Sequence, residues 1–162
     1  MEIQLILGPN NSGKSLYAEE LAVSYAGSPL FYLATMVPQT DDNYKRIEKH
    51  RLQRNGKGFA TIEEPWDIDK INVPSDAVVL LEDASNLTAN GIFLHHSNAE
   101  ESYQKILSLA NRCKALIVVS IAGLKGDQYD EETKAYIDQL NLLNQKLEKA
   151  ASQSYHFQAK EK

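Results

Sequence analysis

Short apolar runs alternate with longer amphipathic or charged segments along this chain. A continuous apolar run of four to eight residues bounded by turn signals is typical of a strand buried on both faces. Runs of this kind predict strands at residues 3–7, 30–35, 59–62, 77–81 and 115–120, and residues 154–157 predict a final edge strand.

The segments between these runs carry helical patterns. Apolar positions three and four residues apart predict helices at residues 15–25, 41–53, 99–112 and 131–151, with a short helical turn at 67–71. Residues 88–94 fit either helix or strand, and residues 95–98 predict a polar loop. The alternation predicts an α/β fold of the P-loop NTPase type, as one domain over residues 1–162, with a mostly parallel sheet and helices on both faces.

Composition narrows the class of protein. A 162-residue chain with 43% hydrophobic and 24% charged residues is ordinary for a globular domain. The net charge of -5 argues against a nucleic-acid partner. Cys113 is the one cysteine, which excludes an intrachain disulfide, and we expect it to be an inert small residue. With no long apolar span, we expect a cytoplasmic protein without a membrane span.

The strongest motif follows the first apolar run. It reads Gly8-Pro9-Asn10-Asn11-Ser12-Gly13-Lys14-Ser15 and fits the phosphate-loop pattern G-x-x-x-x-G-K-[ST] between a strand and a helix. The loop N–H groups and the helix N-terminus suit a polyphosphate. Lys14 is expected to reach the β and γ phosphates of ATP or GTP, and the Ser15 hydroxyl to ligate Mg²⁺. A glycine-rich turn with a surface lysine is the alternative interpretation.

An acidic pair, Glu82-Asp83, follows the apolar run at 77–81. A carboxylate at the end of a central parallel strand can reach a loop-bound Mg²⁺, directly or through water. Glu82 is the first candidate for this metal site, and Asp83 is an equally placed alternative. A helix N-cap or a solvated acidic pair would also explain the two residues.

The charged helix predicted at 41–53 carries Arg46, His50 and Arg54 at intervals of four, so their side chains are expected to align on one face. Two neighbouring guanidiniums should keep the imidazole neutral and nucleophilic, and should also pair with phosphate oxygens. A solvated basic helix face is the alternative. Asp41, at the start of this segment, is interpreted either as a helix cap or as a functional residue.

Several motifs occur in order along the chain: the phosphate loop, Tyr32-Leu-Ala-Thr35, Arg46-x-x-x-His50-x-x-x-Arg54, Thr61-x-Glu63-Glu-Pro65 and Leu80-Leu-Glu82. This arrangement resembles the bifunctional adenosylcobinamide kinase / adenosylcobinamide-phosphate guanylyltransferase family of cobalamin biosynthesis. The resemblance resumes at Ile137-Asp138 and Asn144-Gln145. The phosphate loop is common to many folds, whereas the Arg-His-Arg helix followed by Thr-x-Glu-x-Pro is much more specific.

The resemblance implies two reactions on one corrinoid substrate. His50 would take GMP from GTP as a guanylyl-histidine and pass it to adenosylcobinamide phosphate. Lys14, Arg46 and Arg54 would offset charge on the transferring groups, and Ser15 and Glu82 would hold Mg²⁺. Glu63 would contact the guanine or the ribose. The family also implies a homo-oligomer, specifically a trimer.

The C-terminal half departs from the family pattern. After residues 115–120 the acidic dipeptide and the proline usual in the family are missing, and Asn141 stands where the family tends to have glycine. Two alternatives follow: a P-loop kinase for another small hydroxylated substrate, or a non-catalytic nucleotide-binding regulatory subunit. The pair His95-His96 lacks a third ligand at suitable spacing, so a polar loop is favoured over a metal site. Trp66 and the segment 155–157 are expected to pack in the structure.

Overall fold

The computed structural model describes residues 1–125 and 129–158. Six strands form one parallel sheet in the order β3-β2-β4-β5-β1-β6. The strands are β1 (Ile3–Gly8), β2 (Leu30–Ala34), β3 (Phe59–Glu63), β4 (Val78–Glu82), β5 (Ala115–Ile121) and β6 (Gln153–His156). The prediction of an α/β P-loop fold with a parallel sheet is therefore confirmed, and every predicted strand is present within a residue or two of its expected bounds.

The helices are α1 (Lys14–Val23), α2 (Asp41–Arg54), α3 (Ala84–His95), α4 (Ala99–Ala110) and α5 (Glu131–Ala150), with a 3-10 turn η1 (Ile68–Lys70). The ambiguous segment at 88–94 is thus helical, because Asp83 caps α3 by accepting a hydrogen bond from the Asn86 backbone at 2.8 Å. The capping interpretation of Asp41 is wrong. The Thr40 hydroxyl caps α2 by accepting from the Asn43 backbone, and Asp41 lies in the first turn.

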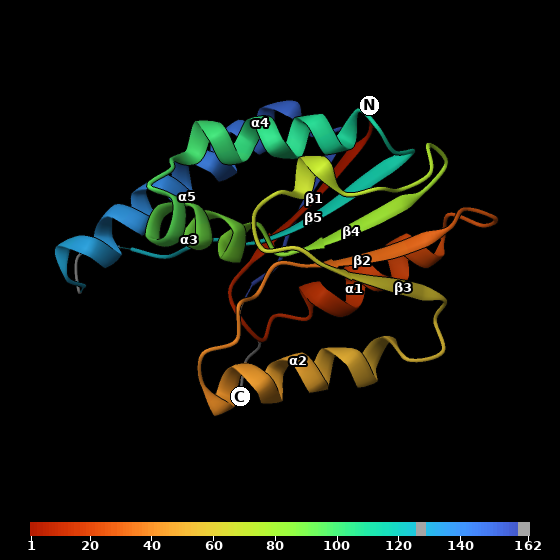
Figure 1. Ribbon diagram of the computed structural model, residues 1–162, viewed down its shortest axis with the longest axis horizontal. Helices are drawn as coiled ribbons and strands as arrows, with labels where there is room; N and C mark the ends of the chain where they lie inside the picture. Colours follow the sequence, from red (N-terminus) through yellow and green to blue (C-terminus); the bar gives the residue numbers. More distant parts are fainter. Residues whose placement is uncertain (126–128, 159–162) are drawn as a thin grey trace.

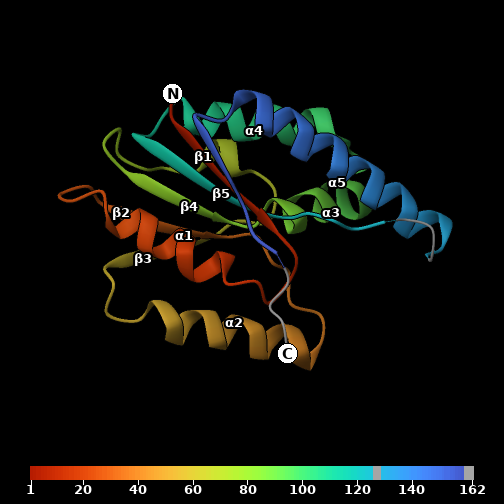
Figure 2. The same ribbon diagram turned by 180° about the vertical axis from the view of Figure 1, so that it is seen from behind.

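Helices cover both faces of the sheet (Figures 1 and 2). Helices α3, α4 and α5 lie on one face, and α1 lies on the other. Alternate strand residues pack into two cores, with Leu5 and Leu81 in the larger core and Ile6 and Leu80 in the core beneath α1. The buried apolar strands therefore fix the sheet register and bring the carboxyl ends of β1, β2, β4 and β5 to one edge.

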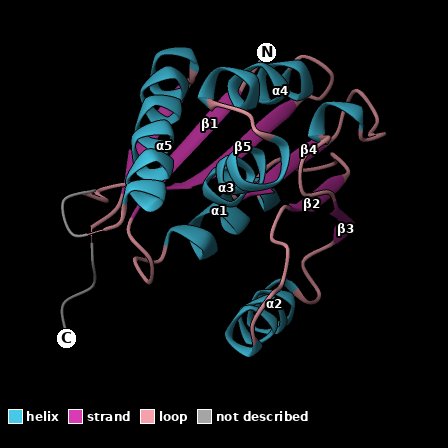
Figure 3. Ribbon diagram, turned by 60° about the vertical axis from the view of Figure 1, so that its left-hand side comes forward, coloured by secondary structure: helices cyan, strands magenta, loops and turns pink. Residues whose placement is uncertain are grey.

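Helix α2 stands away from this layered body (Figures 1 and 3). It packs beyond α1 rather than directly on the sheet, and Arg54 is its one residue with a buried side chain in the described structure. Such a polar helix gains little from apolar burial, so its position depends on individual side-chain contacts.

Several candidate residues have structural roles. His95 is the last residue of α3, not part of a loop, and stacks on the buried Trp66 ring with centroids 5.2 Å apart. Among the described residues, no group of three or more His, Cys, Asp or Glu side chains could hold a metal ion. Burial raises the pKa of the Cys113 thiol to about 11, which fits an inert residue. Tyr155 and Phe157 pack on Tyr17, as expected. Within residues 1–125 and 129–158, no helix is long and apolar enough to cross a membrane.

Candidate active site

The phosphate loop connects the end of β1 to the start of α1. Gly13 has a φ of 90° and Asn11 a φ of 60°, so the loop turns through the left-handed region twice. A Cβ at Gly8 would lie 2.8 Å from Phe157 Cβ and 3.0 Å from Ser12 Oγ, which leaves no room for a side chain. The loop, from Asn10 to Ser15, lines a cavity of about 570 Å³.

Two buried polar groups in the phosphate loop are suited to binding an anionic ligand. The Lys14 ammonium is buried and donates to the Pro9 carbonyl at 3.0 Å. Burial lowers the pKa of Lys14, while the carboxylates of Asp83 and Glu82 oppose that shift. The Ser12 hydroxyl oxygen is also buried, and it has no hydrogen-bond partner among the described residues. An orphaned buried hydroxyl and a buried cation in one loop fit a polyphosphate well.

The Ser15 hydroxyl, at the end of the phosphate loop, contacts both Glu82 and His50. The Ser15 hydroxyl donates to Glu82 Oε1 at 2.7 Å, and its oxygen lies 3.3 Å from His50 Nδ1. Because the single hydroxyl proton is directed at Glu82, the Ser15 oxygen can only accept from the imidazole. This arrangement favours the Nδ1–H tautomer of His50 and leaves the lone pair on Nε2.

Burial and, second to it, the neighbouring Asp83 carboxylate raise the pKa of Glu82 to about 7, against the opposing effects of Ser15 and Lys14. Burial likewise raises the pKa of Asp83, against the hydrogen bond from Asn86. The Thr35 hydroxyl donates to the Asp83 carbonyl and accepts from the Asp83 N–H, both at 2.9 Å, which fixes this segment at the end of β4.

The oxygen groups of Ser15 and Glu82 are of the type that Mg²⁺ prefers, and the half-buried Glu82 and buried Asp83 carboxyl groups, both with raised pKa values, would gain from a nearby cation. The sequence left Glu82 and Asp83 equivalent. The structure separates them, because Glu82 contacts the phosphate-loop serine and Asp83 caps α3. These residues therefore fit a magnesium ion bound with nucleotide.

Helix α2 presents His50 and Arg46 to the phosphate-loop cavity. Burial lowers the pKa of His50, and Arg46, Lys49 and Arg54 lower it further, while Glu19 opposes them. The expected neutral imidazole thus agrees with the direction of its pKa shift, although burial contributes more than either guanidinium.

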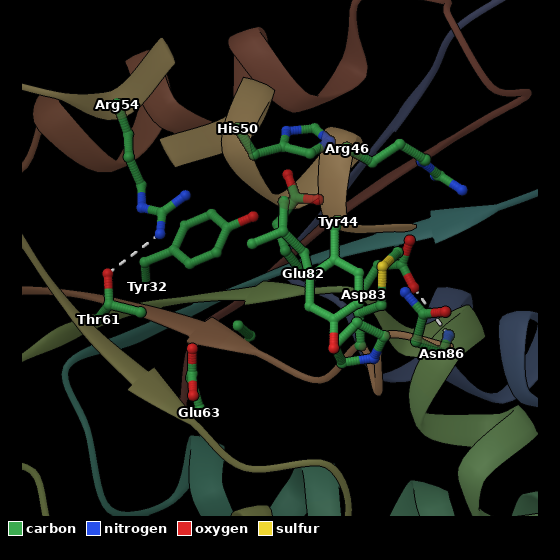
Figure 4. Close-up of a pocket in the computed structure, with 14 residues that line it drawn as sticks. Tyr32, Tyr44, Arg46, His50, Arg54, Thr61, Glu63, Glu82, Asp83 and Asn86 are labelled. Atoms are coloured by element: carbon green, nitrogen blue, oxygen red, sulfur yellow. Dashed lines mark hydrogen bonds between the residues drawn. The ribbon is translucent and has the colours of Figure 1, made fainter. Parts of the chain in front are cut away.

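The Arg54 side chain points toward Tyr32 and Thr61, away from Arg46 (Figure 4). Its guanidinium stacks over the Tyr32 ring at 3.7 Å from the centroid and donates to Thr61 Oγ1 at 3.2 Å. Each step of four residues on a helix of 3.6 residues per turn rotates by roughly 40°, so Arg54 faces a different neighbour from Arg46. Arg46, His50 and Arg54 all line the cavity between α2 and the ends of β2, β3 and β4, but only Arg46 and His50 also line the phosphate-loop cavity.

A second cavity of about 330 Å³ lies between α2 and the ends of β2, β3 and β4. It shares Arg46, His50, Glu82 and Asp83 with the phosphate-loop cavity, and the exposed Glu63 lies on its wall (Figure 4). Further residues that line this cavity were not among the candidates from the sequence: Tyr32, Met36, Tyr44, Thr61 and Asn86. Of these, Tyr32 and Thr61 lie within motifs that the sequence does show.

A parallel sheet, a glycine loop with a buried lysine, and an acidic residue bonded to the loop serine define a P-loop nucleotide-binding protein. The basic helix that places a histidine at the loop narrows this class. The chain belongs to the cobinamide kinase / cobinamide phosphate guanyltransferase family, whose profile matches residues 4–159. No curated protein matches the chain.

As a member of this family, the protein is an enzyme of cobalamin biosynthesis of the cobinamide kinase / cobinamide phosphate guanylyltransferase type. The match covers the divergent C-terminal half, so the non-catalytic alternative is not supported. In that half, Asn144 accepts from the Ser120 hydroxyl at 2.7 Å and donates to the Ile121 carbonyl at 3.0 Å. It thereby ties α5 to the end of β5, beside the phosphate loop.

Proposed function

We propose that this enzyme phosphorylates adenosylcobinamide with ATP or GTP and then transfers GMP from GTP to the product through a guanylyl-His50 intermediate. The observation that carries the proposal is the position of His50 Nδ1, 3.3 Å from the Ser15 hydroxyl of the phosphate loop. A nucleophile at this place lies beside the phosphates that the loop would hold.

In the guanylyl transfer, the lone pair on His50 Nε2 attacks the α-phosphorus of GTP. The N–P bond forms, the bond from that phosphorus to the bridging oxygen breaks, and pyrophosphate leaves. The Nδ1 proton stays on the ring, so a cationic imidazole carries GMP. The phosphate of adenosylcobinamide phosphate then attacks the same phosphorus, the N–P bond breaks and neutral His50 returns. Covalent catalysis thereby divides one difficult transfer into two easier ones.

The charged groups of the site have distinct roles in this scheme. Lys14 binds the β and γ phosphates and stabilises the leaving pyrophosphate, and Arg46 offsets charge at the α-phosphate. Ser15 and Glu82 would hold Mg²⁺, which supplies charge stabilisation for the phosphates when it is bound. Arg54 orders the Tyr32 side of the second cavity, and Glu63 contacts the guanine or the ribose.

The kinase reaction uses the same phosphate loop without His50. The aminopropanol hydroxyl of adenosylcobinamide attacks the γ-phosphorus, the bond to the β-γ bridging oxygen breaks, and the nucleoside diphosphate leaves with the hydroxyl proton released. Lys14 and the loop N–H groups stabilise the transferred phosphoryl group. We further propose that the enzyme works in the cytoplasm as a homo-oligomer, a trimer by analogy with the family.

The test is covalent labelling with [α-³²P]GTP and Mg²⁺, followed by denaturation. Label that survives base, is lost in acid and disappears in His50→Asn is expected, because a phosphoramidate has this stability pattern. His96→Asn is the matched control, since His96 is exposed and its left-handed backbone tolerates asparagine. Absence of label under conditions where GTP binds would overturn the guanylyl-histidine step.

A further inference from the structure

Helix α2 requires a specific anchor because it buries so little. Of its apolar residues, Tyr44 is 61% and Leu52 is 65% exposed, and Arg54 alone of its described residues is classed as buried. The nucleophile of the proposed function lies on this helix. A small rotation or displacement of α2 would therefore move His50 relative to the phosphate loop while exposing little apolar surface.

Glu19 on α1 supplies such an anchor. Its side chain has no exposed surface, accepts from Gln53 Nε2 at 2.5 Å and pairs with Lys57 Nζ at 3.1 Å. Gln53 lies in the last turn of α2, and Lys57 follows its C-terminus. A buried carboxylate is retained at low cost only where it is paired and hydrogen-bonded, as here. The contact thus joins the C-terminal end of α2 to α1.

The geometry of the two helices links this anchor to the active site. Glu19 lies four residues after Ser15, so both point to the same face of α1. Gln53 lies three residues after His50 on the facing side of α2. The Ser15–His50 and Glu19–Gln53 contacts are therefore successive contacts between the same two helices, one turn apart.

We propose that Glu19 is a positioning residue that holds α2 on α1 so that His50 faces the α-phosphate of a nucleotide bound in the phosphate loop. The inference rests on the proposed guanylyl-histidine function. It assigns a role to a buried carboxylate whose side-chain partners in the described structure are Gln53 and Lys57. Because α1 itself begins with Lys14 and Ser15, the anchor fixes the nucleophile relative to the loop that binds its target.

The proposal separates the two half-reactions. Phosphoryl transfer to the cobinamide hydroxyl does not use His50, whereas guanylylation does. A misplacement of about 1 Å can reduce the rate of a positioned reaction about 100-fold. Glu19→Gln is therefore expected to lower the single-turnover rate of enzyme guanylylation by about this factor. The rate of cobinamide phosphorylation should stay close to that of the wild type.

The experiment measures both half-reactions on the full-length enzyme, with [α-³²P]GTP for guanylylation and ATP with adenosylcobinamide for phosphorylation. Glu20→Gln is the matched control, because Glu20 is the exposed neighbour on the same helix. Lys57→Gln removes the other partner of the same ion pair, and it replaces Glu19→Gln as the test variant if Glu19→Gln fails to fold. In a double-variant cycle, the two changes should be non-additive in the guanylylation rate.

An unchanged guanylylation rate in Glu19→Gln and in Lys57→Gln would overturn the proposal. So would an equal loss of both half-reactions, since that result indicates a general structural role. If the wild-type enzyme itself forms no label, the proposed function fails first, and the two failures are thereby distinguished.

Discussion

Replacing Glu82 with glutamine is expected to stabilise the metal-free enzyme at alkaline pH while it removes Mg²⁺-dependent activity. Burial and the adjacent Asp83 raise the pKa of Glu82 from an ordinary 4.5 to about 7. Each pKa unit corresponds to about 1.4 kcal/mol, so ionised Glu82 disfavours the folded state by roughly 3 kcal/mol. The uncharged variant side chain avoids this cost and keeps an amide oxygen that can accept from Ser15.

The sign of the effect sets its pH range. The folded-state pKa lies above the unfolded one, so the folded protein binds the Glu82 proton more tightly. The destabilisation is absent below about pH 4.5, grows as the pH rises, and is complete above about pH 7. As the pH rises from 4.5 to 8.5, the free energy of unfolding of Glu82→Gln should therefore increase relative to that of the wild type by roughly 3 kcal/mol.

The assay is urea unfolding in EDTA, with circular dichroism as the probe, at several pH values across this range. Glu63→Gln is the control, because Glu63 is an exposed carboxylate at the same edge of the sheet, and its profile should follow the wild type. Parallel pH profiles for Glu82→Gln and the wild type would refute the reasoning. A variant that retained full Mg²⁺-dependent activity would remove Glu82 from the metal site.

Three further predictions concern other parts of the molecule. Gly91→Ala should lower the free energy of unfolding by about 1–3 kcal/mol in urea, because its Cβ would lie 2.6 Å from the Trp66 ring; an unchanged unfolding midpoint would contradict this. Arg46→Ala should raise the pKa of His50, so the acid limb of the guanylylation rate should move to higher pH, and a limb that stays in place would exclude this influence. ¹⁵N NMR of histidine-labelled, metal-free enzyme at pH 8.5 should show His50 as the Nδ1–H tautomer, and the preference should weaken in Ser15→Ala; an Nε2–H tautomer in the wild type would contradict the proposed attacking atom.

The strands and the phosphate loop could be predicted because their signals are local. The run before Gly8 is apolar at nearly every position, and a strand buried between two helical layers requires that composition. Gly13 likewise reports a local backbone requirement, because its φ is positive. Gly8 differs, because the room for its Cβ is taken chiefly by Phe157, which lies far along the chain.

The helix at 84–95 was ambiguous because its pattern has little amphipathicity. Its residues pack on several sides, so apolar and polar positions do not separate into two faces. The decisive local signal was Asp83, whose capping function the sequence could not distinguish from metal binding. The contacts of its neighbours decided this, because Glu82 lies beside Ser15 while Asp83 meets the first turn of α3.

The sequence by itself determined the parallel sheet, the phosphate loop, the basic helix with His50 and, through ordered motifs, the family. Only the tertiary structure decided which side chains meet. It turned Arg54 onto Tyr32, placed His50 beside Ser15 and buried Glu19 against Gln53 and Lys57. The physical reason is the range of the interactions. The burial of a strand and the backbone angles of a glycine turn depend mainly on neighbouring residues in the sequence. These contacts instead join residues 22 to 38 positions apart and depend on how α2 packs against the rest of the fold.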